Sequence, residues 1–392
     1  MTRLEPADIV DLAEALRCCG VEKRTVELGG HFTKRAMGGA IAPAAATISI
    51  ARLNAVAQYE PADLTISVEA GLGVQQLEDL LAANNQMLPL DPPFPETATV
   101  GGVIAANCCG PRRRQYGAAR DMVIGMSFLT LEGKEVRSGG MVVKNVAGLD
   151  MAKLLIGSFG TLAAMARVNF KLFPKPPREM TFVLSYQTPA AAWQARDLVI
   201  RGELQPAAID LANPAAAERL AVALPAGYVL LLQTGGIDAV MARYERDLQA
   251  IARETAASEF AVCEPEQARR LWRGVRNFPA LRDEDGAGAA VLRVSTVLNR
   301  LHECFELAGS RPALARAGSG VAYLYCRPFD PELLARARSA GLYTVVESCS
   351  SPDKSGMELW ADPGPELATM REIKQALDPH LLLNHGRLYN RL

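Results

Sequence analysis

The stretch TATVGGVIAANCCGPRRRQYGAARD, residues 97–121, carries the chain's clearest set of groups that could bind an anion. Gly101 and Gly102 stand at the start of an expected short helix, where backbone N–H groups and the positive end of the helix dipole favour a diphosphate. The basic run at residues 112–120 adds guanidinium groups beside a tyrosine and a glycine. A plain helix start and a solvated loop would give the same residue types, so both these interpretations and an anion site stay open on this stretch alone.

A second glycine-rich stretch, GGHFTKRAMGG at residues 29–39, follows an expected strand at residues 25–28. Alternating β-formers then predict a strand at residues 64–70, and apolar residues at helical spacing predict a helix at residues 74–86. Two familiar nucleotide signatures are excluded. The segment GLGVQQ lacks the third glycine of a dinucleotide fingerprint, and GKE at residues 133–135 lacks the upstream glycine and the hydroxyl residue of a P-loop.

The composition describes an ordinary folded protein without a strong overall field. Of the 392 residues 49% are hydrophobic, and 42 basic against 43 acidic side chains leave a formal net charge of -1. This balance gives no reason to expect nucleic acid or an anionic membrane as a partner. The N-terminus lacks the basic start and apolar run of a secretory signal, and no stretch approaches the roughly 20 apolar residues of a membrane span. We therefore expect a cytoplasmic protein without direct membrane insertion.

The cysteines and histidines do not follow a metal-ligand pattern. The eight cysteines include adjacent pairs at residues 18–19 and 108–109 but no C-x-x-C, and the four histidines show no ligand spacing with them. Structural zinc sites and iron–sulfur clusters depend on such spacing. We expect reduced thiols and no metal.

The chain divides into two domains and a tail. Three prolines in PKPPRE, residues 174–179, interrupt any continuing helix or strand. Beyond them strands and helices alternate, a pattern typical of a compact α/β sandwich with helices on one face. The strands of this part are expected at MTFVLSYQ, AAIDLAN, GYVLLLQTG, AVLRVST, GVAYLYCRP and YTVVESC. We predict domains at residues 1–174 and 175–352, followed by a helix and tail at residues 353–392.

Several segments together resemble a known family. The loop GGHFTK, the segment DPP...ATVGG, the turn YGAARD and GSFGTL before a long strand are similar to FAD-binding oxidoreductases of the p-cresol methylhydroxylase (PCMH) or vanillyl-alcohol oxidase superfamily. Within it, GPRRRQYG, KNVAGLD and the ending LDPHLLLNHGRLY resemble the FAD-binding subunits of glycolate oxidase. The resemblance covers nearly the whole chain. It implies an α+β fold, in which a two-subdomain PCMH-type FAD-binding domain is followed by a ferredoxin-like α/β sandwich cap domain and a tail that returns to the flavin domain.

The resemblance implies FAD as the cofactor and places its contacts on this sequence. The loop at residues 29–34 and the segment Thr99–Gly102 are expected to hold the diphosphate and ribityl chain with backbone donors. Residues 107–110 are expected to pass close to the flavin, which makes Cys108 and Cys109 space-filling residues. The expected cofactor contacts are Gly29, Gly30, His31, Phe32, Thr33, Lys34, Ala98, Thr99, Val100, Gly101, Gly102, Asn107, Gly110, Arg112, Tyr116, Arg120, Asp121, Lys144, Asn145 and Asn384.

Some residues depart from the family pattern. His31 can be compared with a histidine that bonds covalently to the flavin in some relatives, so covalent attachment is an alternative to an imidazole packed over the diphosphate loop. His385 replaces the proline of an N-P-G-R ending beside Asn384. In ARRLWRGVRNF, Arg276 falls where 2-hydroxyacid relatives hold a substrate carboxylate, a role that suits a planar guanidinium. Asn277 replaces the usual glutamate there, and a surface arginine on a helix is the other interpretation of Arg276.

The resemblance implies an FAD-dependent oxidoreductase acting on CH–OH groups. The expected protein is the FAD-binding subunit of a glycolate oxidase-like complex, which oxidises a small 2-hydroxy acid to a 2-keto acid by hydride transfer to flavin N5. A catalytic paralogue and an iron–sulfur subunit are the expected partners, because no cysteine motif here could hold an electron relay. ARAGSGVAYLY has no histidine where metal-using relatives carry H-x-G-D-G-N-x-H, so no catalytic metal is expected. Two alternatives stay open: a catalytically silent FAD-binding assembly or electron-transfer subunit, and a stand-alone alcohol oxidase.

Overall fold

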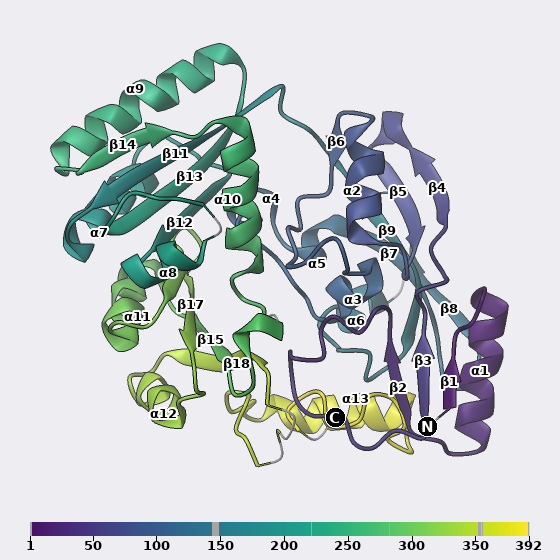
Figure 1. Ribbon diagram of the computed structural model, residues 1–392. Coiled ribbons are helices and arrows are strands. Elements are labelled where there is room, and N and C mark those ends of the chain that lie inside the picture. The colour runs from purple at the N-terminus through teal and green to yellow at the C-terminus, as the bar shows by residue number, and fades with distance from the viewer. Residues whose placement is uncertain are drawn as a thin grey trace. The chain divides into compact units, whose positions relative to one another are not determined.

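The structure is a computed structural model, and it describes residues 2–142, 149–220, 222–281, 283–351, 354, 356–390 and 392. The chain forms two compact units, whose elements are labelled in Figure 1. The first unit contains Met1–Cys109, Gly117–Lys175 and Asp353–Leu392, and the second contains Gly110–Tyr116 and Pro176–Pro352. The C-terminal segment therefore belongs to the same unit as the N-terminal region.

Two sheets and a short ladder build the first unit. The larger sheet is antiparallel with the order β4-β5-β9-β7-β8, the smaller is parallel with the order β1-β3-β2, and β6 pairs with β10. The strands are β1 (Thr2–Leu4), β2 (Val26–Gly29), β3 (Ala46–Ser49), β4 (Val56–Glu60), β5 (Thr65–Glu69), β6 (Gln86–Met87), β7 (Val123–Leu129), β8 (Glu135–Gly139), β9 (Ala164–Lys171) and β10 (Phe173–Pro174). Ile66 pairs with Phe170, and Val68 pairs with Val168, across β5 and β9. These four side chains are fully buried, so this face of the two paired strands packs against a core.

Several helices pack on these sheets. They are α1 (Ile9–Val21), α2 (Val74–Ala82), α3 (Val100–Ala105), α5 (Ala119–Met122), α6 (Met151–Leu155) and α13 (Glu366–Leu377), with a 3-10 turn η1 (Pro61–Asp63). The Asp8 carboxylate accepts from the amide of Asp11 at the start of α1, and the Thr99 hydroxyl accepts from the amide of Gly102 at the start of α3. Such caps satisfy amides that a helix start leaves without a partner.

One eight-stranded antiparallel sheet organises the second unit, in the order β14-β11-β13-β12-β16-β17-β15-β18. The strands are β11 (Arg178–Tyr186), β12 (Ala208–Ala212), β13 (Tyr228–Gly236), β14 (Glu259–Val262), β15 (Ala290–Ser295), β16 (Ala313–Arg316), β17 (Val321–Cys326) and β18 (Tyr343–Cys349). The central strand β13 reads YVLLLQTGG, and its run of leucines is buried. Burial on consecutive positions requires cover on both faces of the sheet.

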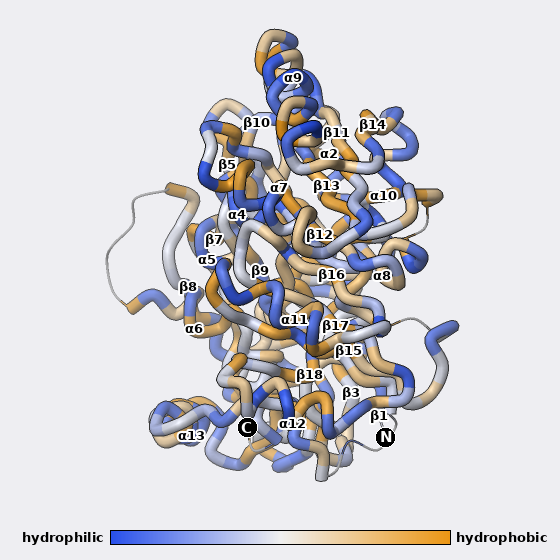
Figure 2. The backbone as a smooth tube through the Cα atoms, turned by 90° about the vertical axis from the view of Figure 1, so that its left-hand side faces the viewer, coloured by the Kyte–Doolittle hydropathy of each residue, from blue (hydrophilic) through white to orange (hydrophobic). Residues whose placement is uncertain are grey.

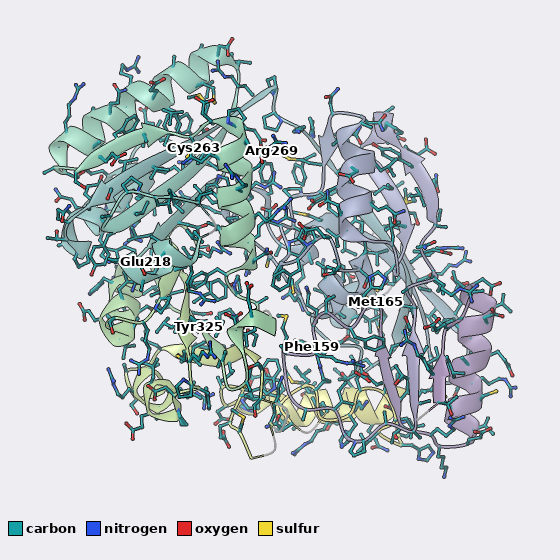
Figure 3. All side chains as sticks on the ribbon, viewed as in Figure 1. Phe159, Met165, Glu218, Cys263, Arg269 and Tyr325 are labelled. Carbon is teal, nitrogen blue, oxygen red and sulfur yellow. The ribbon has the colours of Figure 1, made fainter. Side chains whose placement is uncertain are left out.

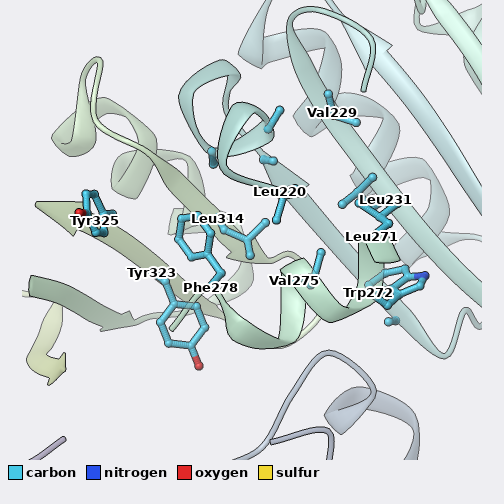
Figure 4. Close-up of a cluster of buried hydrophobic side chains, with 14 of the residues drawn as sticks. Leu220, Val229, Leu231, Leu271, Trp272, Val275, Phe278, Leu314, Tyr323 and Tyr325 are labelled. Atoms are coloured by element: carbon cyan, nitrogen blue, oxygen red, sulfur yellow. The ribbon is translucent and has the colours of Figure 1, made fainter. Parts of the chain in front are cut away.

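Helices of the second unit supply that cover. They are α4 (Arg113–Tyr116), α7 (Pro189–Arg201), α8 (Pro214–Arg219), α9 (Asp238–Glu254), α10 (Pro265–Asn277), α11 (Leu301–Ala308) and α12 (Pro331–Ser339), with η2 (Asp283–Asp285) and η3 (Leu298–Arg300). Leu231 of β13 shares a core cluster with Leu271 and Val275 of α10 (Figure 4). The neighbouring residue Leu230 points to the opposite face, where α7 and α9 contact β13. Figure 2 shows α9 mixing hydrophilic and hydrophobic residues, as expected for a helix that covers a sheet with one side.

The expected elements are confirmed in type, and one feature of their arrangement is wrong. The strand predicted at residues 64–70 is β5, the helix predicted at residues 74–86 is α2, and the tail helix is α13. Helices on one face only were expected in the second domain, whereas α10 covers the other face. The reason is the apolar stripe Leu271, Trp272 and Val275, which needs a buried surface of its own.

All eight cysteines are free in the structure. Within the described ranges, no group of three or more His, Cys, Asp or Glu side chains could hold a metal ion. None of the helices in the described part of the chain is long and apolar enough to span a membrane.

Candidate functional site

A hollow in the first unit lies between the loop after β2, the start of α3 and the C-terminal tail. It encloses about 710 Å³ of space without atoms, counting the part open to solvent. Figure 3 labels two of its lining side chains, Phe159 and Met165. Among the expected cofactor contacts, the hollow is lined by Gly29, Gly30, Phe32, Thr33, Lys34, Thr99, Gly101, Gly102 and Asn384. A volume of this size, lined mainly by apolar and small residues, is typical of a ligand site.

The loop at residues 30–38, here called the first loop, offers a run of backbone donors. The amides of residues 30–34 donate to no acceptor within the described ranges. Phe32 has a φ of 57°, in the left-handed region. Consecutive amides with a left-handed residue among them are typical of backbone nests that bind anions. An anion in the hollow is therefore the natural acceptor for these groups.

Two buried cations beside the first loop strengthen this interpretation. Lys34 and Arg387 are 8% and 7% exposed, and both line the hollow. The Lys34 ammonium donates to the carbonyl of Pro93 at 3.1 Å, and Arg387 Nη2 donates to the carbonyl of Lys34 at 2.7 Å. Burial lowers the pKa of Lys34, and it lowers the pKa of Arg387 to about 10. Neither side chain forms an ion pair with a described carboxylate, so an anionic ligand would offset the cost of burying their charge.

The start of α3 lines the hollow but contributes fewer amides than expected. The amide of Val100 donates to Leu72 at 2.9 Å, and the amide of Gly101 donates to Ala70 at 2.6 Å. A Cβ at Gly101 would meet the Ala70 carbonyl oxygen at 2.9 Å, so close packing against the residue that follows β5 explains this glycine. Contrary to expectation, Val100 and Gly101 have no amide to offer a ligand.

Several other expected contacts have structural partners outside the hollow. His31 is exposed, and its Nδ1 lies 3.0 Å from the carbonyl oxygen of Thr97. Asp121 accepts from the amide of Ala118 at 2.8 Å and thereby starts α5. Arg120 donates to the carbonyl of Lys153 at 3.1 Å. These side chains brace the unit, and they do not line the hollow.

The remaining predicted contacts are distributed over the chain. Ala98 and Asn107 belong to the first unit but do not line the hollow. Gly110, Arg112 and Tyr116 belong to the second unit. Lys144 and Asn145 lie outside the described residues.

Arg276 lies in the last turn of α10 in the second unit and is half-buried. The helix is anchored by Trp272, whose Nε1 donates to Thr181 Oγ1 at 2.9 Å. At its C-terminal end, Arg316 Nη2 donates to the carbonyl of Val275 at 2.9 Å. Arg316 also pairs with Asp210 at 2.9 Å, and these two side chains are 5% and 0% exposed. The backbone that presents Arg276 is therefore held firmly to the sheet.

Sequence reasoning missed several residues of the hollow. Phe159 and Gly160 lie in GSFGTL, which carried the family resemblance, so that motif was a usable signal for them. Arg387 is the arginine of the ending N-H-G-R, which pointed only to Asn384. The other missed lining residues are Glu27, Leu28, Arg35, Ile41, Ile50, Ala105, Ala106, Ala163 and Met165. Arg35, Ala105 and Ala106 lie in the two glycine-containing stretches that the sequence analysis singled out, at residues 29–39 and 97–121. No local pattern marks the other residues as part of a site, because tertiary packing brings them together.

Two protein-family models match the chain. The model described as FAD binding domain matches residues 3–139. The model described as FAD linked oxidases, C-terminal domain, matches residues 175–308 and 360–388. Together the two models cover more than half of the chain.

Three curated relatives with oxidoreductase names match the chain over different shares of its length. Glycolate oxidase subunit GlcE of Escherichia coli (strain K12) is 36% identical over 162 residues, 40% of this chain and 46% of the relative. Glycolate oxidase subunit GlcD of Bacillus subtilis (strain 168) is 27% identical over 207 residues, 53% of this chain and 44% of the relative. The mitochondrial D-lactate dehydrogenase (cytochrome) of Arabidopsis thaliana is 26% identical over 413 residues, 98% of this chain and 72% of the relative. The chain thus spans less than half the length of the two glycolate oxidase subunits.

A solved structure extends the likeness to the fold. The 4-ethylphenol oxidase from Gulosibacter chungangensis, in its isoeugenol complex, matches with a TM-score of 0.74 at 14% identity. The match covers 99% of this chain and 89% of that chain. At this identity the likeness concerns the fold alone, and it confirms the fold class expected from the sequence.

Proposed function

The chain belongs to the family of FAD-linked oxidases, and on this premise we propose that it is the FAD-binding subunit of a glycolate oxidase-like complex. Its cofactor is FAD, and its general activity is that of an oxidoreductase. The proposed reaction is the oxidation of a small 2-hydroxy acid to a 2-keto acid. The likeness to a relative named glycolate oxidase subunit GlcE supports the subunit role.

The observation that carries the proposal is the first loop with its unbonded amides beside two buried cations. These groups fit the cofactor, because a diphosphate would accept from the amides of residues 30–34 and would balance the charges of Lys34 and Arg387. Ala105, Ala106 and Gly102 keep the adjoining wall of the hollow free of large side chains. When bound, FAD supplies the acceptor for the hydride that leaves the substrate.

Arg276 is the proposed substrate-carboxylate contact. Its guanidinium belongs to a helix turn that Arg316 and Trp272 fix to the sheet, and a fixed planar fork suits a carboxylate. The residue that removes the hydroxyl proton is left unassigned. The competing interpretation, a surface arginine without contact to substrate, predicts no effect of its removal on KM.

The proposed partners are a catalytic paralogue and an iron–sulfur subunit. Support comes from relatives whose names describe two different subunits, GlcE and GlcD, of glycolate oxidase. We propose that the assembly works in the cytoplasm. Electrons from the reduced flavin would leave through the iron–sulfur subunit, since this chain carries no cysteine motif for a relay.

An anaerobic absorbance experiment tests the proposed activity. The purified chain, alone and with co-purifying subunits, is titrated with glycolate, D-lactate and L-lactate while the flavin band is recorded. Bleaching by at least one 2-hydroxy acid is the expected result. A flavoprotein that none of them bleaches, in either form, would contradict the proposed reaction.

The second candidate is a catalytically silent FAD-binding subunit, and the segment ARAGSGVAYLY favours it, because it has no histidine where metal-using relatives carry H-x-G-D-G-N-x-H. Arg316 of this segment pairs with the buried carboxylate of Asp210 at 2.9 Å. Under this alternative the flavin stays oxidised with every 2-hydroxy acid, although the chain still assembles with a catalytic partner.

A further inference from the structure

Two cations of the C-terminal segment hold the carbonyl groups of the first loop. Arg387 donates to the carbonyl of Lys34 at 2.7 Å and to the carbonyl of Arg35 at 3.4 Å. The ammonium of Lys354 donates to the carbonyls of Arg35, Ala36 and Gly38 at 3.3, 2.8 and 3.0 Å. The first loop thus has its carbonyl groups bound by residues more than 300 positions later in the chain.

Holding these carbonyls fixes the direction of the amides, because each peptide group is planar and rigid. The carbonyl of Lys34 shares its peptide plane with the amide of Arg35, and that amide donates to the carbonyl of Phe32 at 3.3 Å. The carbonyl of Phe32 in turn shares its plane with the amide of Thr33, one of the unbonded donors. A chain of two rigid planes therefore connects Arg387 to a donor of the hollow.

The burial of Arg387 and Lys354 indicates a role beyond surface solubility. They are 7% and 6% exposed. By contrast, the nearby Arg35 is 58% exposed in its side chain and pairs with the carboxylate of Glu27 at 2.7 Å. Burying the charge of Arg387 is costly, and the carbonyl dipoles of the first loop offset only part of that cost. An anionic ligand on the amide side would add compensation for the charge of Arg387.

We infer that Arg387 and Lys354 are positioning residues for FAD: they orient the first loop so that its amides meet the cofactor's diphosphate. The inference rests on the assignment of the hollow to FAD and is independent of the identity of the substrate. Under this inference the affinity for FAD depends on the C-terminal segment, which lies outside both glycine-rich stretches. The C-terminal segment would act on the diphosphate end of FAD through the first loop.

The test compares FAD and pyrophosphate affinities of full-length variants. Arg387→Lys, Arg387→Met and Lys354→Met are prepared without flavin and titrated with FAD by fluorescence quenching. Inorganic pyrophosphate then competes with FAD for the same donors. Arg371→Met is the matched control, because Arg371 is an exposed cation of the same segment on α13.

The expected result is a rise in the Kd for FAD of roughly 10–100-fold in both methionine variants, as for other residues that orient ligand-holding groups. The inhibition constant for pyrophosphate should rise with it, and Arg387→Lys should recover part of the loss. Arg371→Met should bind both ligands like the wild type. If a methionine variant does not fold, Arg387→Lys decides, because it keeps the charge and loses the two-pronged contact.

The inference would be overturned if folded Arg387→Lys and Lys354→Met bound FAD and pyrophosphate with the same constants as the wild type, even with a lower melting temperature. The assignment of the hollow to FAD would then still stand. A wild-type chain that binds no FAD would instead contradict the assignment of the hollow itself. The two failures are therefore distinguishable in one set of titrations.

Discussion

Asn384 joins three distant parts of the first unit through one amide side chain. Its Oδ1 accepts from the amide of Leu28 at 2.7 Å, and its Nδ2 donates to the carbonyls of Leu28 and Phe159 at 3.0 and 2.8 Å. The residue is 3% exposed. Asn384→Ala would leave these backbone groups without that partner. At roughly 1–3 kcal/mol for each buried group, partly relieved by water, we expect a loss of about 3–5 kcal/mol in the free energy of unfolding.

The assay is urea unfolding of the flavin-free chain, followed by circular dichroism. The two units could unfold separately, so the relevant transition is the one that added FAD moves to higher urea. Asn390→Ala is the control, because Asn390 is exposed and its side chain donates, among the described residues, to the carbonyl of Met357 at 3.1 Å. A loss below about 1 kcal/mol for Asn384→Ala, similar to that for Asn390→Ala, would refute the reasoning from unsatisfied groups.

Three further predictions concern buried or functional cations. Lys374→Met breaks the ion pair of Lys374 and Asp378, whose side chains are 1% and 0% exposed. It should lower the free energy of unfolding of the first unit by about 3–5 kcal/mol in the same urea assay. A change near zero would contradict this prediction. Burial lowers the pKa of Lys34, and an anion favours its charged form, so FAD affinity should fall as pH rises through that lowered pKa. Titrations from about pH 7 to about pH 9, below the pKa of about 10 to which burial lowers Arg387, should show this fall in the wild type and not in Lys34→Met. Arg276→Ala should raise KM for the 2-hydroxy acid roughly 10-fold or more, as expected for losing a charged hydrogen bond, and an unchanged KM in steady-state assays would leave Arg276 as a surface residue.

The local elements of this fold could be predicted because their signals are short-ranged. The alternating β-formers of residues 64–70 and the helical spacing of Val74, Leu77 and Leu81 each depend on neighbours in sequence. The glycine-rich stretch at residues 29–39 was recognisable as a loop for the same reason. Composition and spacing were sufficient at this level, since strands and helices have fixed periods.

The parts that escaped prediction depend on tertiary packing. The amides of Val100 and Gly101 look available in the sequence, and only the approach of Ala70 and Leu72 shows that they are already bonded. Arg387 gave no signal of its own, because its partners lie in the first loop at the other end of the chain. The sequence pointed to the segments that line the hollow. Only the structure shows which backbone amides are free to meet a ligand and which already donate to the protein.

The central claim, that the hollow of the first unit holds FAD, is tested most directly by filling it. Ala105 lines the hollow and is only partly buried, so Ala105→Phe should occupy ligand space at little cost to folding. Flavin-free wild type and Ala105→Phe are titrated with FAD in parallel, with melting temperature as the folding control. We predict one FAD per wild-type chain and a large loss of affinity in the variant. Equal FAD binding by both proteins would contradict the assignment.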